Sequence, residues 1–183
     1  MILPDRLEGP NLRLRPLRPT DRDALYAAAA DPDIWALHPA KTRHERTTFD
    51  PYFDFLLSTG ESYVVVDKTA DKVIGTSRFY TADDPPGSHS IGYTFLARSH
   101  WGGRANFEMK SLMIDHILNH ANAVWFHIDA HNLRSQKATE KLGARLAFTD
   151  RVLDFGNGPA SYWGYRLDRD IWQKVISDAC QQD

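Results

Sequence analysis

SHWGGRANFEMKSLMIDHIL, residues 99–118, decides the topology of this chain, because two adjacent glycines are followed at once by a helical pattern. The helix is expected over Asn106–Ala121, and its apolar stripe consists of Met109, Leu112, Met113, Ile117 and Leu118. A strand is predicted on each side, at Ser88–Leu96 and at Val124–Ala130. Strand, glycine turn, helix and strand form a crossover unit, so we predict a mixed α/β sheet.

The same turn offers a site for an anion. Backbone N–H groups at the start of a helix lack partners within the helix, and the helix dipole favours negative charge there. Phosphate is the natural ligand of such a turn. The stretch has neither the Gly-Lys-Ser/Thr ending of a Walker A loop nor a G-x-G-x-x-G pattern. Taken alone, it also fits a purely structural link between strand and helix.

The rest of the chain supplies further strands and helices of ordinary length. Strands are predicted at Asn11–Leu17, Glu61–Asp67, Lys72–Tyr80, Arg145–Leu153 and Ser161–Leu167. The second and third of these form a hairpin, so the sheet starts antiparallel. A helix should follow Thr20, where Thr20 and Asp23 resemble a capping box. Two more helices are expected, over Thr47–Leu57 and Leu133–Leu142.

The composition is that of an ordinary globular protein and excludes several classes of function. The 183 residues are 42% apolar and 25% charged, which suits one domain with one core. Twenty-two basic against 24 acidic residues give a net charge of -2, so no basic surface for nucleic acid is expected. The single cysteine, Cys180, cannot form an internal disulfide, and no apolar run is long enough to span a membrane. We therefore expect a cytoplasmic protein without nucleic-acid or membrane partners.

Twelve residues at fixed spacing carry a resemblance to a known family. They are Trp101, Gly102, Asn106, Glu108, Lys110, Asp129, Asn132, Ser135, Glu140, Lys141, Leu142 and Gly143. This pattern is similar to that of the Gcn5-related N-acetyltransferases, specifically their RimJ/RimL-type branch. The resemblance implies an α/β fold: a single GNAT-like domain over residues 1–183, with a mixed, mostly antiparallel, splayed sheet flanked by helices.

The resemblance also implies acetyl-CoA as co-substrate, with its pyrophosphate on the turn before the long helix. Arg104 stands where the family has its second glycine, so either its N–H still points inward or the loop is rebuilt. Arg134 and Lys137 are partners for the 3'-phosphate, although a solvated basic helix face explains both equally well. The residues carried over for the cofactor are Phe95, Leu96, Trp101, Gly102, Gly103, Arg104, Ala105, Asn106, Asn132, Arg134, Ser135 and Lys137.

Two residues are candidates for proton transfer. Ser135 stands at the family position whose hydroxyl can hold or protonate the leaving thiolate, because Thr139 occupies the place where many members have a Tyr. The alternative is a structural role for Ser135 at its helix start. Asp154 lies 19 residues after Ser135, the spacing of a carboxylate that can serve as base in RimL-type enzymes. Asp150 competes with it, and Glu108 is expected to make a structural bond to the loop.

The acceptor is the least determined part of the reaction. The resemblance implies that the acceptor is a primary amine, on a small molecule or on a peptide. In this family the segment Asp31–Thr59 would line the acceptor side of the site. Rivals are transfer of a longer acyl group such as succinyl, and an inactive CoA-binding module. Trp35, His38, Trp101 and Trp125 are either pocket walls or core aromatics. We expect no metal, because His116 and His120 lack the Glu of H-E-x-x-H, and a homodimer is left open.

Overall fold

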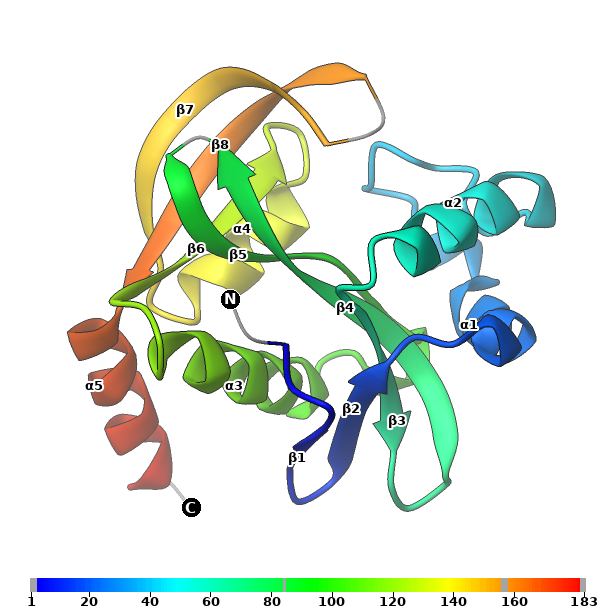
Figure 1. Ribbon diagram of the computed structural model, residues 1–183, viewed down its shortest axis with the longest axis horizontal. Coiled ribbons are helices and arrows are strands. Elements are labelled where there is room, and N and C mark those ends of the chain that lie inside the picture. Colours follow the sequence, from blue (N-terminus) through cyan, green and yellow to red (C-terminus); the bar gives the residue numbers. More distant parts are fainter. Residues whose placement is uncertain (1–2, 84, 156–157, 182–183) are drawn as a thin grey trace.

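Within the residues that the computed structural model describes, 3–83, 85–155 and 158–181, eight strands form one sheet (Figure 1). Their order across the sheet is β1-β2-β3-β4-β5-β6-β8-β7, and β5 with β6 is the parallel pair. The strands are β1 (Leu7–Glu8), β2 (Leu12–Pro16), β3 (Ser62–Asp67), β4 (Lys72–Asp83), β5 (Pro86–Leu96), β6 (Ala123–Asp129), β7 (Arg145–Asp154) and β8 (Pro159–Asp168). The predicted fold, a mixed and mostly antiparallel α/β sheet flanked by helices, is confirmed.

Helices connect and cover these strands. They are α1 (Arg22–Ala29), α2 (Arg46–Ser58), α3 (Ala105–Leu118), α4 (Leu133–Glu140) and α5 (Arg169–Cys180), with short 3-10 turns η1 (Pro19–Asp21), η2 (Pro32–Ile34) and η3 (Arg98–His100). Sequence analysis missed β1, which is too short to show a period, and α5. The apolar residues of α5 do recur at helical spacing, so its signal was present: Ile171, Trp172, Val175 and Ile176.

The predicted capping box at the start of the first helix is wrong. The chain first makes the 3-10 turn η1, and it is Asp21 that accepts the backbone N–H of Arg18 at 2.8 Å. Asp21 also forms two hydrogen bonds with the guanidinium of Arg15, at 2.7 and 2.8 Å. A nearby strand therefore supplies the partner that fixes this turn. The Arg15 guanidinium and the hydrogen bonds to Asp21 lower the pKa of that carboxyl even though its burial acts in the opposite direction.

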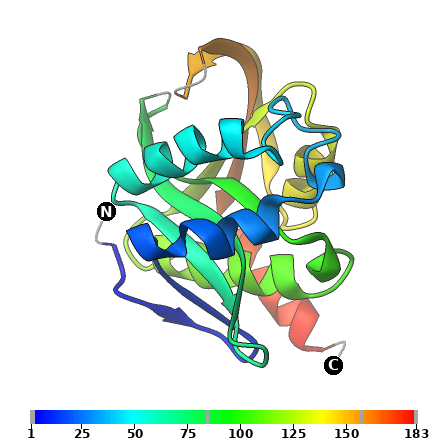
Figure 2. The same ribbon diagram turned by 90° about the vertical axis from the view of Figure 1, so that its right-hand side faces the viewer.

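The two faces of the sheet carry separate cores. Alternation along β3 sends Val64 and Val66 to one face and Tyr63 and Val65 to the other. The first face is covered by α1 and α2, which lie in front of the strands in Figure 2. The second face is covered by α3, with α5 beside it.

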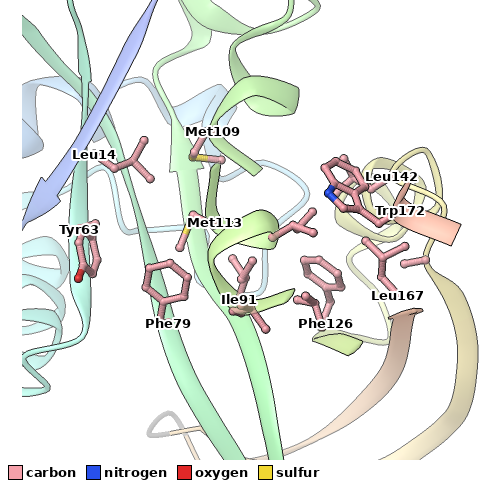
Figure 3. Packing of buried hydrophobic residues seen from close by; sticks show 14 of the residues in the cluster. Leu14, Tyr63, Phe79, Ile91, Met109, Met113, Phe126, Leu142, Leu167 and Trp172 are labelled. Carbon is pink, nitrogen blue, oxygen red and sulfur yellow. The ribbon is translucent and has the colours of Figure 1, made fainter. Parts of the chain in front are cut away.

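The core under α3 ties the two halves of the sheet together. Met109 and Met113 of α3 lie among side chains from β2 to β8, as Figure 3 shows. Phe126 of β6 and Leu167 of β8 belong to the same cluster as Tyr63 of β3. Because α3 spans both halves, it holds them together where the strands themselves do not.

β5 and β6 share a single ladder pair, Ser90 with Trp125, and then separate. The cause lies in β5, where Tyr93 and Thr94 stand opposite the single residue Ser77 of β4. This is a bulge, and it places Tyr93 in the left-handed region with a φ of 53°. Bulges bend a strand and leave one residue out of the ladder. The two parallel strands thus part, and α3 and α4 both begin after the ends that separate.

Glu108 of α3 fastens the first hairpin to this helix. Its Oε1 accepts the backbone N–H groups of Asn11 and Leu12, both at 2.8 Å, and its Oε2 accepts the amide of Asn11 at 2.9 Å. A carboxylate that holds three donors makes strong, charge-assisted bonds. The structural role expected for Glu108 fits this geometry, because both oxygens of its carboxylate accept hydrogen bonds from Asn11 and Leu12.

Candidate active site

The turn between β5 and α3 is open to solvent. Its residues from Trp101 to Arg104 are exposed. Gly102 has a φ of 71°, a left-handed conformation that glycine adopts readily because it has no Cβ. A Cβ on Gly103 would meet no atom within 4 Å. Within the described residues, the side chain of Arg104, which precedes the helix, makes no capping hydrogen bond to the start of α3. The first N–H groups of this helix are therefore accessible to an anion.

The departure at Arg104 does not disturb this turn. Arg104 has helical angles, φ -79° and ψ -11°, so a glycine is not required there. Ala105 and Asn106 follow in the first turn of α3 and are half-buried. Phe95 and Leu96, at the end of β5, have buried side chains in the two cores. These two residues can therefore offer a ligand only their backbone.

Trp101 joins the turn to α4. Its indole Nε1 donates to the carbonyl of Leu96 at 2.9 Å, and the guanidinium carbon of Arg134 lies 4.4 Å from the centre of its ring. Arg134 also donates to the carbonyl of Ile34 at 2.6 Å. Burial lowers the pKa of Arg134 from its ordinary value. The predicted cofactor residues Trp101 and Arg134 thus lie together, while Lys137 is exposed one turn further along α4.

Asn132 and Ser135 meet at the start of α4. The side chain of Asn132 accepts the backbone N–H of Ser135 at 3.2 Å and so caps the helix. The capping role at this start therefore belongs to Asn132. The half-buried hydroxyl of Ser135 has no hydrogen bond to any residue that the structure describes. Thr139 is buried one turn later.

Asp154 lies at the exposed end of β7. The next residue, Phe155, accepts the hydroxyl of Tyr93 at 2.8 Å, which brings the end of β7 against the bulge in β5. Burial raises the pKa of Tyr162 to about 12, and the charges of Asp129 and Asp154 act in the same direction. Both carboxylates therefore act electrostatically on Tyr162.

The bulge is held from both faces of the sheet. From α2, the hydroxyl of Tyr52 donates to the carbonyl of Tyr93 at 3.3 Å. From α3, the amine of Lys110 donates to the Thr94 hydroxyl at 2.7 Å, and this hydroxyl lies 2.7 Å from that of Ser77. Burial lowers the pKa of Lys110 from 10.5 to about 7. A buried amine thus lies directly beneath the point where β5 and β6 separate.

The other candidate groups lie in ordinary structural settings. Asp150, in β7, accepts the indole N–H of Trp163 at 3.1 Å. Trp35 is buried and Trp125 stacks on His127, whereas Trp101 is 38% exposed. Over residues 3–83, 85–155 and 158–181, no group of three or more His, Cys, Asp or Glu side chains is placed to hold a metal ion. Within the same ranges, none of the helices has the length and apolar character needed to cross a membrane.

The model of the acetyltransferase (GNAT) domain family matches residues 11–145, which includes the split strands, the glycine turn, α3 and α4. The chain belongs to the GNAT acetyltransferase family. No curated protein matches the chain.

Solved structures share the GNAT fold at low sequence identity. A GCN5-related N-acetyltransferase from Brucella melitensis is 19% identical over 94% of this chain and 82% of its own, with a TM-score of 0.79. A GNAT acetyltransferase from Bacillus anthracis is 13% identical over 90% and 99%, with a TM-score of 0.68. RimJ from Mycobacterium smegmatis, in complex with CoA-disulfide, is 16% identical over 95% and 93%, with a TM-score of 0.66. At these identities, the likeness establishes the fold.

Sequence analysis assigned no role to two residues that the GNAT fold brings to the split. Tyr93 follows a glycine within a strand pattern, and an isolated glycine there is a signal for a bulge. Lys110 falls on the helix face that it shares with Ile114 and Ile117, so a single charge interrupts a buried stripe. Both signals are visible in the sequence, although neither says what the residue contacts.

The lowered pKa of Lys110 predicts how stability depends on pH. Between pH 7 and 10.5 the unfolded chain binds a proton at this amine that the folded chain has lost, so the free energy of unfolding rises with pH across this window. The slope approaches about 1.4 kcal/mol per pH unit. The free energy of unfolding, measured with denaturant from pH 7 to 9.5, should rise with pH in the parent relative to Lys110→Met. The exposed Lys174→Met serves as control, and a constant difference for Lys110→Met would contradict the prediction.

Proposed function

We propose that this GNAT domain transfers an acetyl group from acetyl-CoA to a primary amine by direct attack of the amine. The observation that carries the proposal is the uncapped start of α3 behind an exposed glycine turn, where β5 and β6 separate. Such a helix start suits a pyrophosphate. The motif residues shared with the RimJ/RimL-type branch support the same assignment, and so does the CoA-disulfide complex of the M. smegmatis RimJ. We regard residues 1–183 as one cytoplasmic N-acetyltransferase domain.

The residues present fit CoA. The backbone from Gly102 to Asn106 would receive the pyrophosphate, and the edge of β5 at Phe95 and Leu96 would pair with the pantetheine arm. Beyond Ser90, this edge has no ladder partner in β6 within the described residues. Lys137, exposed on α4, would reach a phosphate of the nucleotide. Acetyl-CoA supplies a thioester, whose carbonyl carbon bonds to the amine while the thiolate leaves.

Two groups at the split would stabilise the charges that form during transfer. The carbonyl oxygen becomes negative as the amine attacks, and the bulge sets Tyr93 and Thr94 against the single residue Ser77, so one of the two lies outside the regular β4 ladder. Their N–H groups are our candidates for this oxyanion. The Ser135 hydroxyl, which has no partner among the described residues, would donate a proton or a hydrogen bond to the departing sulfur. Asn132 keeps the start of α4 in place through the Ser135 N–H.

Asp154 would remove the proton from the attacking amine. It is exposed at the end of β7, one residue from the contact between Phe155 and Tyr93. Because the carboxylate lies at the exposed rim of the site, we propose that it acts through a water molecule. Of the two other carboxylates considered, Glu108 binds the first hairpin and Asp150 binds Trp163.

Gly103→Val should abolish tight CoA binding and leave the fold intact. The added Cβ meets no atom of the protein within 4 Å, but it projects from the backbone that would approach the pyrophosphate. At 100 times its dissociation constant, acetyl-CoA should stabilise the parent by about 2.7 kcal/mol. Thermal melts with and without acetyl-CoA measure this gain. The control Ser99→Val, in the same loop, should still be stabilised by acetyl-CoA as the parent is. If acetyl-CoA stabilises Gly103→Val as much as the parent, the pyrophosphate binds elsewhere.

Ser135→Ala should lower kcat by about ten- to a thousandfold and weaken acetyl-CoA binding much less, since the hydroxyl matters mainly when the sulfur becomes negative. The measurement is release of CoA thiol from acetyl-CoA with a panel of primary amines, compared with release from succinyl-CoA. The parent should release CoA from acetyl-CoA with at least one amine, and Ser135→Thr should retain most of this rate. Binding without any release across the panel would leave a CoA-binding module and overturn the proposed transfer.

Asp154→Asn should depress the rate at neutral pH and regain part of it at high pH, where the amine is already deprotonated. The change keeps the shape of the side chain and removes its basicity. A pH–rate profile from pH 6 to 10 measures the effect, with Asp150→Asn as the matched variant. If the profile changes for Asp150→Asn and not for Asp154→Asn, the role of base passes to Asp150.

A further inference from the structure

Arg43 is a buried cation that the protein does not neutralise. It lies between η2 and α2 and is 7% exposed. Its guanidinium carbon is 3.8 Å from the ring centre of Tyr52 and 5.2 Å from that of Trp35. Among the residues that the structure describes, its side chain forms no hydrogen bond and no ion pair. Burial of an unpaired charge is costly, so this arrangement calls for an anion from outside the chain.

Three other arginines near Arg43 show how the chain treats the same motif elsewhere. Arg22, Arg46 and Arg78 also lie over aromatic rings. Each of them has a carboxylate partner as well: Asp54 for Arg22, Asp23 for Arg46 and Glu61 for Arg78. Arg43 also lies over aromatic rings, but it has no carboxylate partner among the described residues. Its guanidinium carbon lies over the rings of Tyr52 and Trp35, and a guanidinium carries its five N–H donors in its own plane.

Contacts of the two rings place Arg43 beside the split in the sheet. Tyr52 donates to the carbonyl of Tyr93 in the bulge, and Trp35 packs on Phe95 at 5.2 Å between ring centres. Burial lowers the pKa of His38 to about 4, and the Arg43 charge acts in the same direction. The charges of Arg43 and Asp154 both act on Tyr162, in opposite directions.

We propose that Arg43 binds a carboxylate of the acceptor, so the acceptor is a small amino carboxylate, such as a free amino acid, rather than a peptide N-terminus. This inference rests on the proposed acetyl transfer. A planar guanidinium with free in-plane donors matches the two oxygens of a carboxylate. Asp154 supplies the opposite charge near the same bulge, on the side where the amine would lose its proton. The pair of charges therefore suits a zwitterion.

The solvent can reach this guanidinium. Within the described residues, the buried side-chain polar atoms without a partner are Nε of Arg13 and Nδ1 of His89, and no nitrogen of Arg43 is among them. Its neighbours His38, Tyr93 and Tyr162 are half-buried. A small carboxylate can thus approach without unfolding the segment.

The experiment compares L-amino acids with their α-carboxamides, which keep the side chain and the amine and lose the charge. Measured as thiol release from acetyl-CoA, kcat/KM should be at least tenfold higher for the amino acid than for its carboxamide. The amine of the carboxamide is less basic and more often neutral, so amine reactivity alone would favour the carboxamide. Arg43→Met should lower kcat/KM for the acid by about 30- to 1,000-fold and change the carboxamide by less than about threefold. Arg46→Met, which also removes a guanidinium from above a tyrosine ring, should leave both unchanged.

Two further measurements keep the inference separate from the proposed function. Thermal melts with CoA and each amino acid report binding without turnover, and Arg43→Lys, which keeps the charge but not the planar fork, should show an intermediate loss. Stabilisation by amino acids that disappears in Arg43→Met, without any thiol release, would uphold the carboxylate site and overturn acetyl transfer. Equal acetylation of acids and carboxamides, or a preference for peptides, would uphold transfer and overturn the role of Arg43.

Discussion

The separation of β5 from β6 is the constraint on which the rest of the structure depends. A single ladder pair, Ser90 with Trp125, joins two halves of a sheet that would otherwise continue. The two-residue bulge at Tyr93 and Thr94 turns β5 away, and unpaired backbone is costly unless other groups hold it. The side chains that hold the bulge come from both layers of helices, and the core under α3 replaces the missing ladder. An opening in a sheet is stable here because packing and side-chain bonds act where strand pairing stops.

The same opening gathers the chemistry of the molecule. α3 and α4 both start after the separating strand ends, so two helix starts and one free strand edge face the same region. The glycine turn before α3 is exposed, whereas the start of α4 is capped by Asn132. The start of α4 is thus satisfied internally, and we propose that the start of α3 receives a ligand. The proposed acceptor side differs in character, because its groups are aromatic rings and the charge of Arg43 rather than backbone N–H groups.

Much of this could be predicted from local pattern. The period of α3, the valine-rich β3 and the glycine turn follow from residues that are neighbours in the sequence, and the resemblance to GNAT enzymes placed the cofactor residues on them. The failures involve partners that are distant in the chain or segments that are short. The capping box was misplaced because Arg15, in the preceding strand, binds Asp21, and β1 has only two residues in which to show a period. Ser135 was recognised as a candidate, but its open hydroxyl emerged only when Asn132 was seen to cap the helix.

The sequence by itself determined the order of every strand and α-helix except β1 and α5, together with the crossover through α3, because these depend on periodicity within short segments. The residues that could carry acetyl transfer came from the resemblance to GNAT enzymes. Only the tertiary structure decided which charged groups are neutralised. Arg43 and Arg46 are three residues apart and both lie over tyrosine rings, yet Arg46 pairs with Asp23 and Arg43 has no carboxylate in the described part of the chain. That difference depends on which side chains are brought within a few ångströms of each guanidinium when distant segments fold together. Coulomb energy falls off with distance, and the spacing of residues along the chain does not specify distances in space.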